Sequence, residues 1–344
     1  MLEKFTISRD DSIHEGFPDV CLTTTGRLII IYRESDSHSA AQFTHLVWRC
    51  SDDSGATWSG KRYLARSEAA DGVLFKWNCP RIVQLSDGRI LAICDGYPVP
   101  PGEGGSQYDA RTHLWTSTDN GESFDGPVAT NVPGIVPDRI VELQSGRLLL
   151  GTHLRAPEVD GLSRQMVHIS DDGGATWSGP RTICSTHHYW ACEGGIVQLP
   201  GGEVICYMRD NSRTGIPGPK CISFNDGDDW YGPFDTPMGG CHRPVPGVTA
   251  SGHMLVLYRH QPGFGPFAKN LFAYRETLES ALSPHRNKQT GIVLPLDHDR
   301  SAESDSSYVG WVQLQDGRIF VVNYIKDDAP TAQIRGYYFT EDEF

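Results

Sequence analysis

The sequence has no apolar run approaching the length that spans a bilayer, and its opening stretch, MLEKFTISRDDSIHEG, lacks the hydrophobic segment of a secretory signal. It is also poor in positive charge, since 30 Lys and Arg stand against 43 Asp and Glu, for a net charge of -13 at pH 7. Such a surface repels polyanions, so we expect neither a nucleic-acid partner nor an anionic membrane. We expect a cytoplasmic protein, or a secreted one whose signal has been removed.

Several metal-binding and catalytic motifs are missing as well. The nine cysteines form no CxxC pair and no zinc spacing, and the 13 histidines include no HExxH motif. GxSxG is absent too, so nothing indicates a serine hydrolase. We therefore predict no metal and no cofactor. Cysteines within apolar segments, such as Cys94 and Cys206, are interpreted as reduced, buried thiols.

What the sequence does contain is an internal repeat. An apolar segment, a tight turn with glycine and a second apolar segment recur six times, at 19–32, 81–94, 139–152, 195–208, 244–258 and 310–324. The turn glycines lie 62, 58, 56, 50 and 65 residues apart, at Gly26, Gly88, Gly146, Gly202, Gly252 and Gly317. Two-residue hairpin turns need positive φ, which glycine adopts without strain. Each copy therefore predicts a β-hairpin.

A second signature, S-x-D-x-G-x-[TS]-[WF], follows the third strand of the early repeats. It reads SDDSGATW at 51–58, STDNGESF at 117–124 and SDDGGATW at 170–177, with a degraded copy, SFNDGDDW, at 223–230. The aspartate can accept backbone N–H bonds within the turn, the glycine supplies positive φ, and the aromatic ring can pack on a sheet. We assign Asp53, Asp119 and Asp172 of this Asp-box a structural role.

A fourth strand per repeat is expected at 61–66, 127–132, 181–186 and 291–296. The last repeat ends after three strands, and the alternating segment at 4–9 can supply its fourth, near 332–340. The predicted fold is all-β: a six-bladed β-propeller of four-stranded antiparallel blades, closed by the N-terminal strand, with residues 1–344 in a single domain.

Charged residues stand where the first strand of a blade begins, in places where packing does not need them. They include Arg81, Arg139, Glu193, His242 and Arg243. One arginine at such a position is commonly a solvated loop charge, whereas several around one axis favour a ligand site, since crowded charges must be paired or used. We expect these arginines to form a site for an anion.

Asp-boxes in a six-bladed propeller make the chain resemble the sialidase (neuraminidase) superfamily, and the pattern extends over essentially the whole sequence. The resemblance implies a glycoside hydrolase acting on a carbohydrate with a terminal acidic sugar. It implies that Tyr308, in SSYVGWVQL, is the nucleophile, that Glu193, in YWACEGGIVQL, activates it, and that Asp36 is the acid/base. Arg209, in CYMRD, resembles one arginine of the triad that holds the substrate carboxylate.

The sequence departs from that family where other arginines of the triad would stand. Gly16-Phe17-Pro18 contains no arginine, and Asn323-Tyr324 stands where a glutamate is expected. The third site reads Phe267-Ala268-Lys269-Asn270-Leu271, without arginine. Arg33, Arg81, Arg139 and Arg243 are additional candidates for binding the substrate.

Two alternatives stay open. His188 or His242 could act as a general acid or base in a lyase or hydrolase for uronate- or rhamnose-containing polysaccharide, or could simply line the site through hydrogen bonds. The protein could also be a glycan-binding propeller without catalysis, because Asp-boxes specify a fold better than a reaction.

Overall fold

The computed structural model describes residues 2–100, 108–156, 161–212, 214–262 and 269–344. These residues form 25 strands, one short α-helix and two 3-10 helices, and the strands are arranged in six antiparallel sheets. The chain divides into two compact units, the first made of Met1–Pro137 with Tyr308–Glu341 and the second of Asp138–Ser307 with Asp342–Phe344. Each unit contains three of the sheets.

The first unit combines two four-stranded sheets with one five-stranded sheet. One sheet contains β2 (His14–Leu22), β3 (Leu28–Ser35), β4 (Phe43–Ser51) and β5 (Arg62–Glu68). The next contains β10 (Asp125–Pro133), β9 (Arg111–Ser117), β8 (Ile90–Val99) and β6 (Leu74–Trp77), with β7 (Arg81–Gln84) also paired to β8. The third contains β1 (Glu3–Ser8), β25 (Gln333–Phe339), β24 (Ile319–Ile325) and β23 (Gly310–Gln313).

The second unit is built in the same way. Its first sheet contains β11 (Val141–Glu142), β12 (Leu148–Ala156), β13 (Leu162–Ser170) and β14 (Ser178–Cys184). The second contains β15 (Ala191–Gln198), β16 (Val204–Asp210), β17 (Lys220–Ser223) and β18 (Tyr231–Phe234). The third contains β19 (Cys241–Val248), β20 (His253–His260), β21 (Asn270–Thr277) and β22 (Gly291–His298). The predicted all-β fold class, a six-bladed propeller with four-stranded antiparallel blades, is confirmed.

The repeated hairpins are confirmed in all six sheets, and the turn glycines have the expected conformation. Their φ values lie between 80° and 99°. Strands β3 and β24, which follow such turns, are buried along their entire length, because apolar residues point to both faces. Outer strands such as β10 are largely exposed. The buried strands therefore form the core, and the loops at their ends are left to carry side chains for function.

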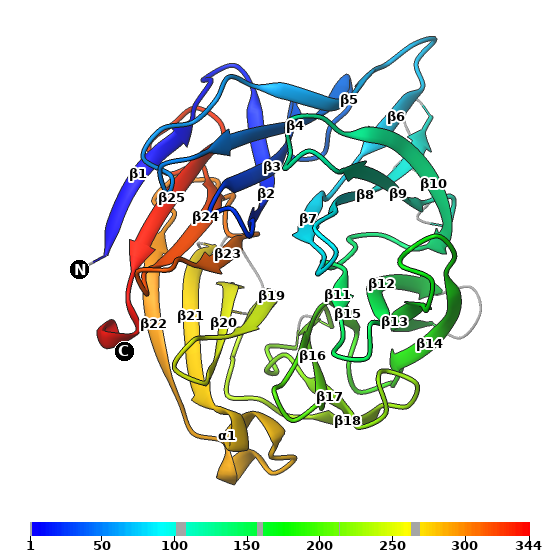
Figure 1. The fold of residues 1–344 in the computed structure, drawn as a ribbon, viewed down its shortest axis with the longest axis vertical. Coiled ribbons are helices and arrows are strands. Elements are labelled where there is room, and N and C mark those ends of the chain that lie inside the picture. Colours follow the sequence, from blue (N-terminus) through cyan, green and yellow to red (C-terminus); the bar gives the residue numbers. More distant parts are fainter. Residues whose placement is uncertain (1, 101–107, 157–160, 213, 263–268) are drawn as a thin grey trace. The chain divides into compact units, whose positions relative to one another are not determined.

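The N-terminal strand completes the last sheet, as predicted. In Figure 1, β1 (blue) lies beside β25 (red), and the two pair antiparallel from Glu3 opposite Tyr338 to Ser8 opposite Ile334. Because β25 would otherwise present an unpaired edge, this pairing covers backbone groups that could recruit another chain.

Two features were not predicted. Strand β6 adds a fifth strand to its sheet by pairing with the far end of β8. Helix α1 (Leu278–Leu282) follows β21 where earlier repeats have an Asp-box, and the Thr277 side chain caps it by accepting the Ser280 N–H. Two 3-10 helices, η1 (Arg286–Lys288) and η2 (Glu341–Glu343), lie after α1 and β25. Among the described helices none has the length and apolarity needed to cross a membrane.

The Asp-box turns have the predicted structural role. In the first, Asp53 accepts hydrogen bonds from the Thr57 backbone N–H (2.8 Å) and hydroxyl (2.6 Å), and the Ser51 hydroxyl accepts the Gly55 N–H. These bonds favour the carboxylate and lower the pKa of Asp53 to about 2. Trp58 stacks on Phe320 of another sheet, with ring centroids 5.9 Å apart.

The degraded fourth copy keeps the same turn by exchanging its polar groups. Asn225 occupies the aspartate position and accepts the Asp229 N–H at 3.0 Å, while its own amide donates to the Asp229 carboxylate at 2.9 Å. The Trp230 indole still donates to the Gly227 carbonyl at 3.0 Å. Asp229 stands where the first Asp-box has Thr57, so the side-chain hydrogen bond runs in the opposite direction while the backbone hydrogen bond is kept.

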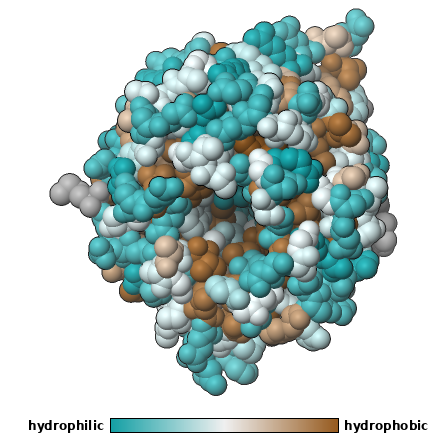
Figure 2. Space-filling model, viewed as in Figure 1, coloured by the Kyte–Doolittle hydropathy of each residue, from teal (hydrophilic) through white to brown (hydrophobic). Residues whose placement is uncertain are grey.

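Buried aspartates connect neighbouring sheets within each unit. Asp19 of β2 accepts the Ile82 N–H of β7 at 3.0 Å, and Asp138 accepts the Ile196 N–H of β15 at 2.6 Å. All nine cysteines are buried and unbridged, as expected of reduced thiols. On the face drawn in Figure 2, hydrophilic residues predominate over hydrophobic ones, in keeping with a mean hydropathy of -0.37.

Candidate functional site

The first strands of three sheets share a backbone irregularity at their start. Strands β2, β15 and β19 each shift register there, and the displaced residue is a non-glycine residue with positive φ: Phe17 (57°), Glu193 (49°) and Arg243 (50°). Each stands nine residues before the turn glycine of its hairpin. Such a conformation costs about 1–3 kcal/mol and is maintained where it directs a side chain for function.

In the second unit this bulge directs Glu193 toward Arg209. The Glu193 carboxylate accepts a hydrogen bond from Arg209 Nη1 at 2.9 Å, and Arg209 Nη2 donates to the Asn211 side chain at 2.7 Å. The Glu193 backbone N–H donates to His153 Nδ1 at 3.3 Å. Arg209 keeps 17% of its side-chain surface exposed, compared with 9% for Glu193. The pair is therefore enclosed but still accessible from one side.

His242 lies within a group of positive charges next to this pair. Burial, together with the charges of Arg209 and Arg259, lowers the pKa of His242 to about 2, and the negative charge of Glu193 opposes that shift only in part. Among the described residues, His242 Nδ1 has no hydrogen-bond partner. At neutral pH this imidazole is therefore uncharged and a weak base.

Lys269 and Arg259 extend the group. Burial and the neighbouring Arg259 lower the pKa of Lys269, while Asp305, whose carboxylate lies 3.5 Å from Nζ, raises it. The Arg259 Nε donates to the Ser306 carbonyl at 2.6 Å. Of the stretch in which the family would have its third arginine, Phe267 and Ala268 lie outside the described residues, and Lys269 supplies the cation. We call Arg209, Arg259, Lys269, His242 and Glu193 the charged cluster.

The remaining sequence candidates of the second unit differ in position. Arg243 is fully buried, and its charge helps lower the pKa of His153, which burial brings to about 4. Arg139 is partly exposed in the segment before β11. His188 is exposed after β14, where its ring contacts Tyr189 edge-on at 4.6 Å. The second unit therefore brings Glu193, Arg209 and His242 together, whereas His188 lies on the surface.

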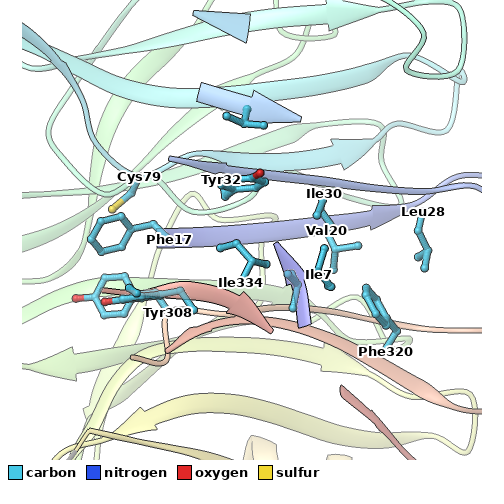
Figure 3. Packing of buried hydrophobic residues seen from close by; sticks show 14 of the residues in the cluster. Ile7, Phe17, Val20, Leu28, Ile30, Tyr32, Cys79, Tyr308, Phe320 and Ile334 are labelled. Carbon is cyan, nitrogen blue, oxygen red and sulfur yellow. The ribbon is translucent and has the colours of Figure 1, made fainter. Parts of the chain in front are cut away.

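In the first unit, Tyr308 belongs to an aromatic cluster around Phe17. The rings of Tyr308 and Tyr324 lie 5.6 and 5.1 Å from that of Phe17, and His38 lies 5.1 Å from it. Figure 3 shows Phe17, Cys79 and Tyr308 at one end of the hydrophobic cluster, away from Phe320. Tyr308 is 7% exposed, so the ring is held in place by packing.

Arg33 closes over the same phenylalanine. Its guanidinium carbon lies 4.4 Å from the centre of the Phe17 ring, and Nη2 donates to the His38 carbonyl at 2.6 Å. Nη1 donates to the Asn78 side chain at 3.4 Å. Burial lowers the pKa of Arg33, and no ion pair involves Arg33 within the described part of the chain.

Arg81 is occupied by contacts within the same unit. It is 2% exposed, its Nη1 donates to the Val309 carbonyl at 2.9 Å, and it lies 3.6 Å from the Asp19 carboxylate. These contacts connect three sheets of the first unit through one guanidinium. These buried contacts give Arg81 a structural role.

Asp36 organises the loop that precedes β4. Its carboxylate accepts the backbone N–H groups of Ala41 and Gln42, each at 3.0 Å, and of Phe43 at 3.4 Å. Burial raises the pKa of Asp36, but these bonds outweigh it and leave the pKa below its ordinary value. In this conformation Asp36 is ionised at neutral pH.

Sequence reasoning missed three residues that a second periodicity would have found. The residue seven positions after each turn glycine lies in the second half of the second strand of its hairpin. These residues are Arg33, Asp95, His153, Arg209, Arg259 and Tyr324. All are charged or polar and follow directly after the apolar part of the strand. Asp95, His153 and Arg259 could have been singled out by extending the repeat one residue past its apolar part.

Comparison with known proteins agrees with this fold. The chain matches the BNR repeat-like domain over residues 76–321, most of its length, and belongs to that family. Among curated proteins, none matches the sequence.

Solved structures of similar fold include three with distinct descriptions. A protein of unknown function from Dyadobacter fermentans is 20% identical with a TM-score of 0.79, covering 98% of this chain and 97% of its own. A Hadza microbial sialidase is 16% identical with a TM-score of 0.71, covering 99% and 69%. An α-L-arabinofuranosidase from Fusarium graminearum, bound to an iminosugar inhibitor, is 12% identical with a TM-score of 0.63, covering 100% and 97%. The expected likeness to the sialidase superfamily is confirmed at the level of the fold.

Proposed function

We propose that the protein is a glycoside hydrolase that removes a terminal acidic sugar, sialic acid or a related one, from a glycan. The observation that carries this proposal is the charged cluster. Arg209, Arg259 and Lys269 gather around His242 in a protein whose net charge is -13. Arg259 is buried, whereas Arg209 and Lys269 keep 17% and 24% of their side chains exposed beside Glu193 and Asp305. Accessible cations gathered in an acidic protein favour the binding of an anion. An arginine fork matches the two oxygens of a sugar carboxylate.

Glu193 suits the role of a base within this site. Its carboxylate is held by Arg209 at 2.9 Å and directed by a strained bulge, so it is positioned before a substrate arrives. A tyrosine has a pKa of about 10 and is a poor nucleophile at neutral pH unless a carboxylate takes its proton. We assign Tyr308 as the nucleophile and Glu193 as its base, on the pattern that the sialidase superfamily suggests.

The reaction would proceed in two displacements. Tyr308 Oη forms a bond to the anomeric carbon and gives its proton to the carboxylate base, while the glycosidic C–O bond breaks and the leaving oxygen takes a proton from the acid. Water then attacks the anomeric carbon and gives a proton back to the acid, and the departing tyrosine oxygen regains its proton from the base. Asp36 is the candidate proton donor from the sequence, and it must be protonated to act, whereas its described hydrogen bonds favour the carboxylate.

A lyase or hydrolase of uronate- or rhamnose-containing polysaccharide is the second candidate. It is favoured by the missing arginine at Gly16-Phe17-Pro18 and would use His188 or His242 as the base. The low pKa of His242, about 2, makes its imidazole a weak base, and His188 is exposed on the surface. These observations favour the hydrolase.

The experiment is an assay against 4-methylumbelliferyl α-N-acetylneuraminide, β-glucuronide and α-L-arabinofuranoside, with Tyr308→Phe and Glu193→Gln as controls. We expect release of methylumbelliferone from an acidic glycoside and its loss in both variants. Cleavage of the arabinofuranoside alone would overturn the acidic-sugar assignment. Binding of acidic sugars without cleavage of any glycoside would identify a glycan-binding propeller.

A further inference from the structure

A cavity outside the charged cluster lies on the sheet formed by β2, β3, β4 and β5 in the first unit. Its volume is about 630 Å³, within the range of small-molecule sites. The side chains that matter for its chemistry are Glu34, Phe43, His45, Tyr63, Arg66 and Glu68. None of these residues is used by the proposed hydrolase.

Strand register places three of these side chains in one row. Glu34 of β3 stands opposite His45 of β4, and His45 stands opposite Arg66 of β5. Directly opposed residues of antiparallel strands point to the same face, with Cβ atoms about 5 Å apart. The row therefore presents a carboxylate, an imidazole and a guanidinium side by side.

Aromatic rings form a wall beside this row. The His45 ring lies 5.0 Å from that of Phe43 and 5.9 Å from that of Tyr63. The Arg66 guanidinium covers Tyr63, with its central carbon 3.8 Å from the ring centroid. Phe43, His45 and Tyr63 are all half-buried and line the cavity, and Arg66 covers one face of Tyr63. The parts of the Phe43 and Tyr63 rings that stay uncovered give the cavity an aromatic side.

The polar groups of the cavity are held in place from behind. Glu34 is 2% exposed and accepts a hydrogen bond from Lys61 Nζ at 2.6 Å, and the same ammonium group binds the buried Glu15 at 2.7 Å. His45 Nδ1 is buried and has no hydrogen-bond partner in the described chain.

The charge of the cavity decides the class of ligand. Two carboxylates, Glu34 and Glu68, face it along with one guanidinium, and Lys61 is divided between Glu34 and Glu15. An anionic sugar would meet carboxylates here, whereas hydroxyl groups donate readily to them. The C–H face of a pyranose ring packs on aromatic rings by the same apolar contact that Phe43 and Tyr63 offer.

From these contacts we infer that the cavity is a second carbohydrate-binding site, specific for a neutral sugar unit. It is separate in chemistry from the charged cluster, which favours an acidic one. Asp36 holds the amide groups of Gln42 and Phe43, both of which line the cavity, so the loop that forms one wall is fixed in place.

The test is isothermal titration of the full chain with lactose, maltose and cellobiose, and with glucuronate as the charged counterpart. Tyr63→Ala should weaken binding of a neutral disaccharide about tenfold, while Tyr63→Phe keeps the ring and stays within about twofold. Tyr231→Ala, which removes a 57% exposed ring of β18 in the second unit, is the matched control and should change nothing. Glu68→Gln should improve glucuronate binding, because one repelling charge is removed.

Three outcomes would overturn the inference: none of the disaccharides binds at millimolar concentration, Tyr63→Ala leaves their affinity unchanged, or Arg209→Lys abolishes their binding. The last would assign that binding to the charged cluster. Hydrolysis of methylumbelliferyl glycosides is measured separately, so an inactive protein that still binds lactose through Tyr63 would refute the hydrolase and leave this site standing. An active enzyme that does not bind lactose would refute this site and leave the hydrolase standing.

Discussion

Arg33 in the first unit and Arg209 in the second stand at the same place in the repeat, seven residues after the turn glycine, yet their surroundings differ. Arg33 is fully buried, and its described partners are the carbonyls of the Ser37–His38 loop, the Asn78 amide and the face of Phe17. Arg209 is paired with Glu193 and keeps part of its surface exposed. Its side chain therefore stays partly accessible, whereas the Arg33 guanidinium is enclosed and donates to a loop.

Under the proposed function, one repeated position serves structure in the first unit and substrate binding in the second. A buried arginine that donates to carbonyls fixes the chain that carries them, and an arginine beside a bulged glutamate orients a reactive group. The environment of the arginine depends on the residue nine positions before the turn glycine. That residue is Phe17 beside Arg33 and Glu193 beside Arg209. Substitutions in both units can test this contrast.

Removing the reactive groups should have the largest effect. We expect Glu193→Gln and Tyr308→Phe each to lower kcat on an acidic arylglycoside by at least about 100-fold, since each removes a group that moves a proton or bonds to the substrate. Glu279→Gln, at an exposed position of α1, is the control and should keep full activity. A Tyr308→Phe variant that is as active as the wild type would show that the ring serves packing alone.

The paired substitutions Arg209→Lys and Arg33→Lys should separate the two roles. Arg209→Lys should weaken binding of an acidic sugar by roughly 1–3 kcal/mol, because lysine cannot make a bidentate contact. Arg33→Lys should leave that affinity unchanged and lower the free energy of unfolding by about 1–3 kcal/mol, since one ammonium cannot replace the bonds to His38 and Asn78. Titration calorimetry and urea unfolding measure the two quantities. Loss of affinity in Arg33→Lys would contradict the contrast and return Arg33 to the substrate site.

Asp36 can be tested by comparing Asn with Ala at the same position. If the carboxylate serves to hold the loop, Asp36→Asn keeps an oxygen that accepts N–H bonds and retains more activity than Asp36→Ala. If Asp36 is the acid, both variants should be about equally slow, and a glycoside with a more acidic leaving group should restore the rate. Steady-state rates on aryl glycosides of graded phenol acidity distinguish these outcomes.

The smallest effect concerns Lys76, a neighbour of Arg33. Burial and the positive charge of Arg33 lower the pKa of Lys76 to about 8, from an ordinary value of 10.5. Between these values the folded state binds fewer protons than the unfolded one, so this group makes the free energy of unfolding rise as pH rises from about 8 to 10.5. Arg33→Gln should raise the pKa and flatten that rise, as followed by NMR titration of the lysine side chain. An unchanged pKa would mean that burial alone causes the shift.

Local patterns predicted most of the fold. The hairpin repeats, their turn glycines, the Asp-boxes and the closing strand at 4–9 are all confirmed, because each depends on residues close together in sequence or on strand alternation. Strand β6 was not predicted because its four residues are too few to show the alternation of apolar and polar side chains that is typical of a strand. The degraded fourth Asp-box keeps the turn, because Asn225 still accepts the backbone N–H and bonds to the side chain four residues on.

The candidate site was predicted less completely. Glu193 and Arg209, two residues that the sequence singles out, lie in contact. Arg259 was not predicted because its stretch, LVLYRH, reads as an apolar strand. Two of the predicted arginines have hydrogen-bond partners that are distant in the sequence. Arg81 donates to the Val309 carbonyl, and Arg33 donates to the Asn78 side chain. No sequence pattern distinguishes an arginine that will be enclosed from one that will stay accessible.

The propeller itself follows from the amino-acid sequence: where strands run, where turns fall and which strand closes the last sheet. These features depend on β-propensity, alternation and positive φ, which act over a few residues. The tertiary structure alone decides which charges are paired, which are buried among carbonyls and which stay open to a ligand. Burial and electrostatic environment depend on contacts between residues far apart in the chain, such as Arg33 with Asn78 or Arg81 with Val309.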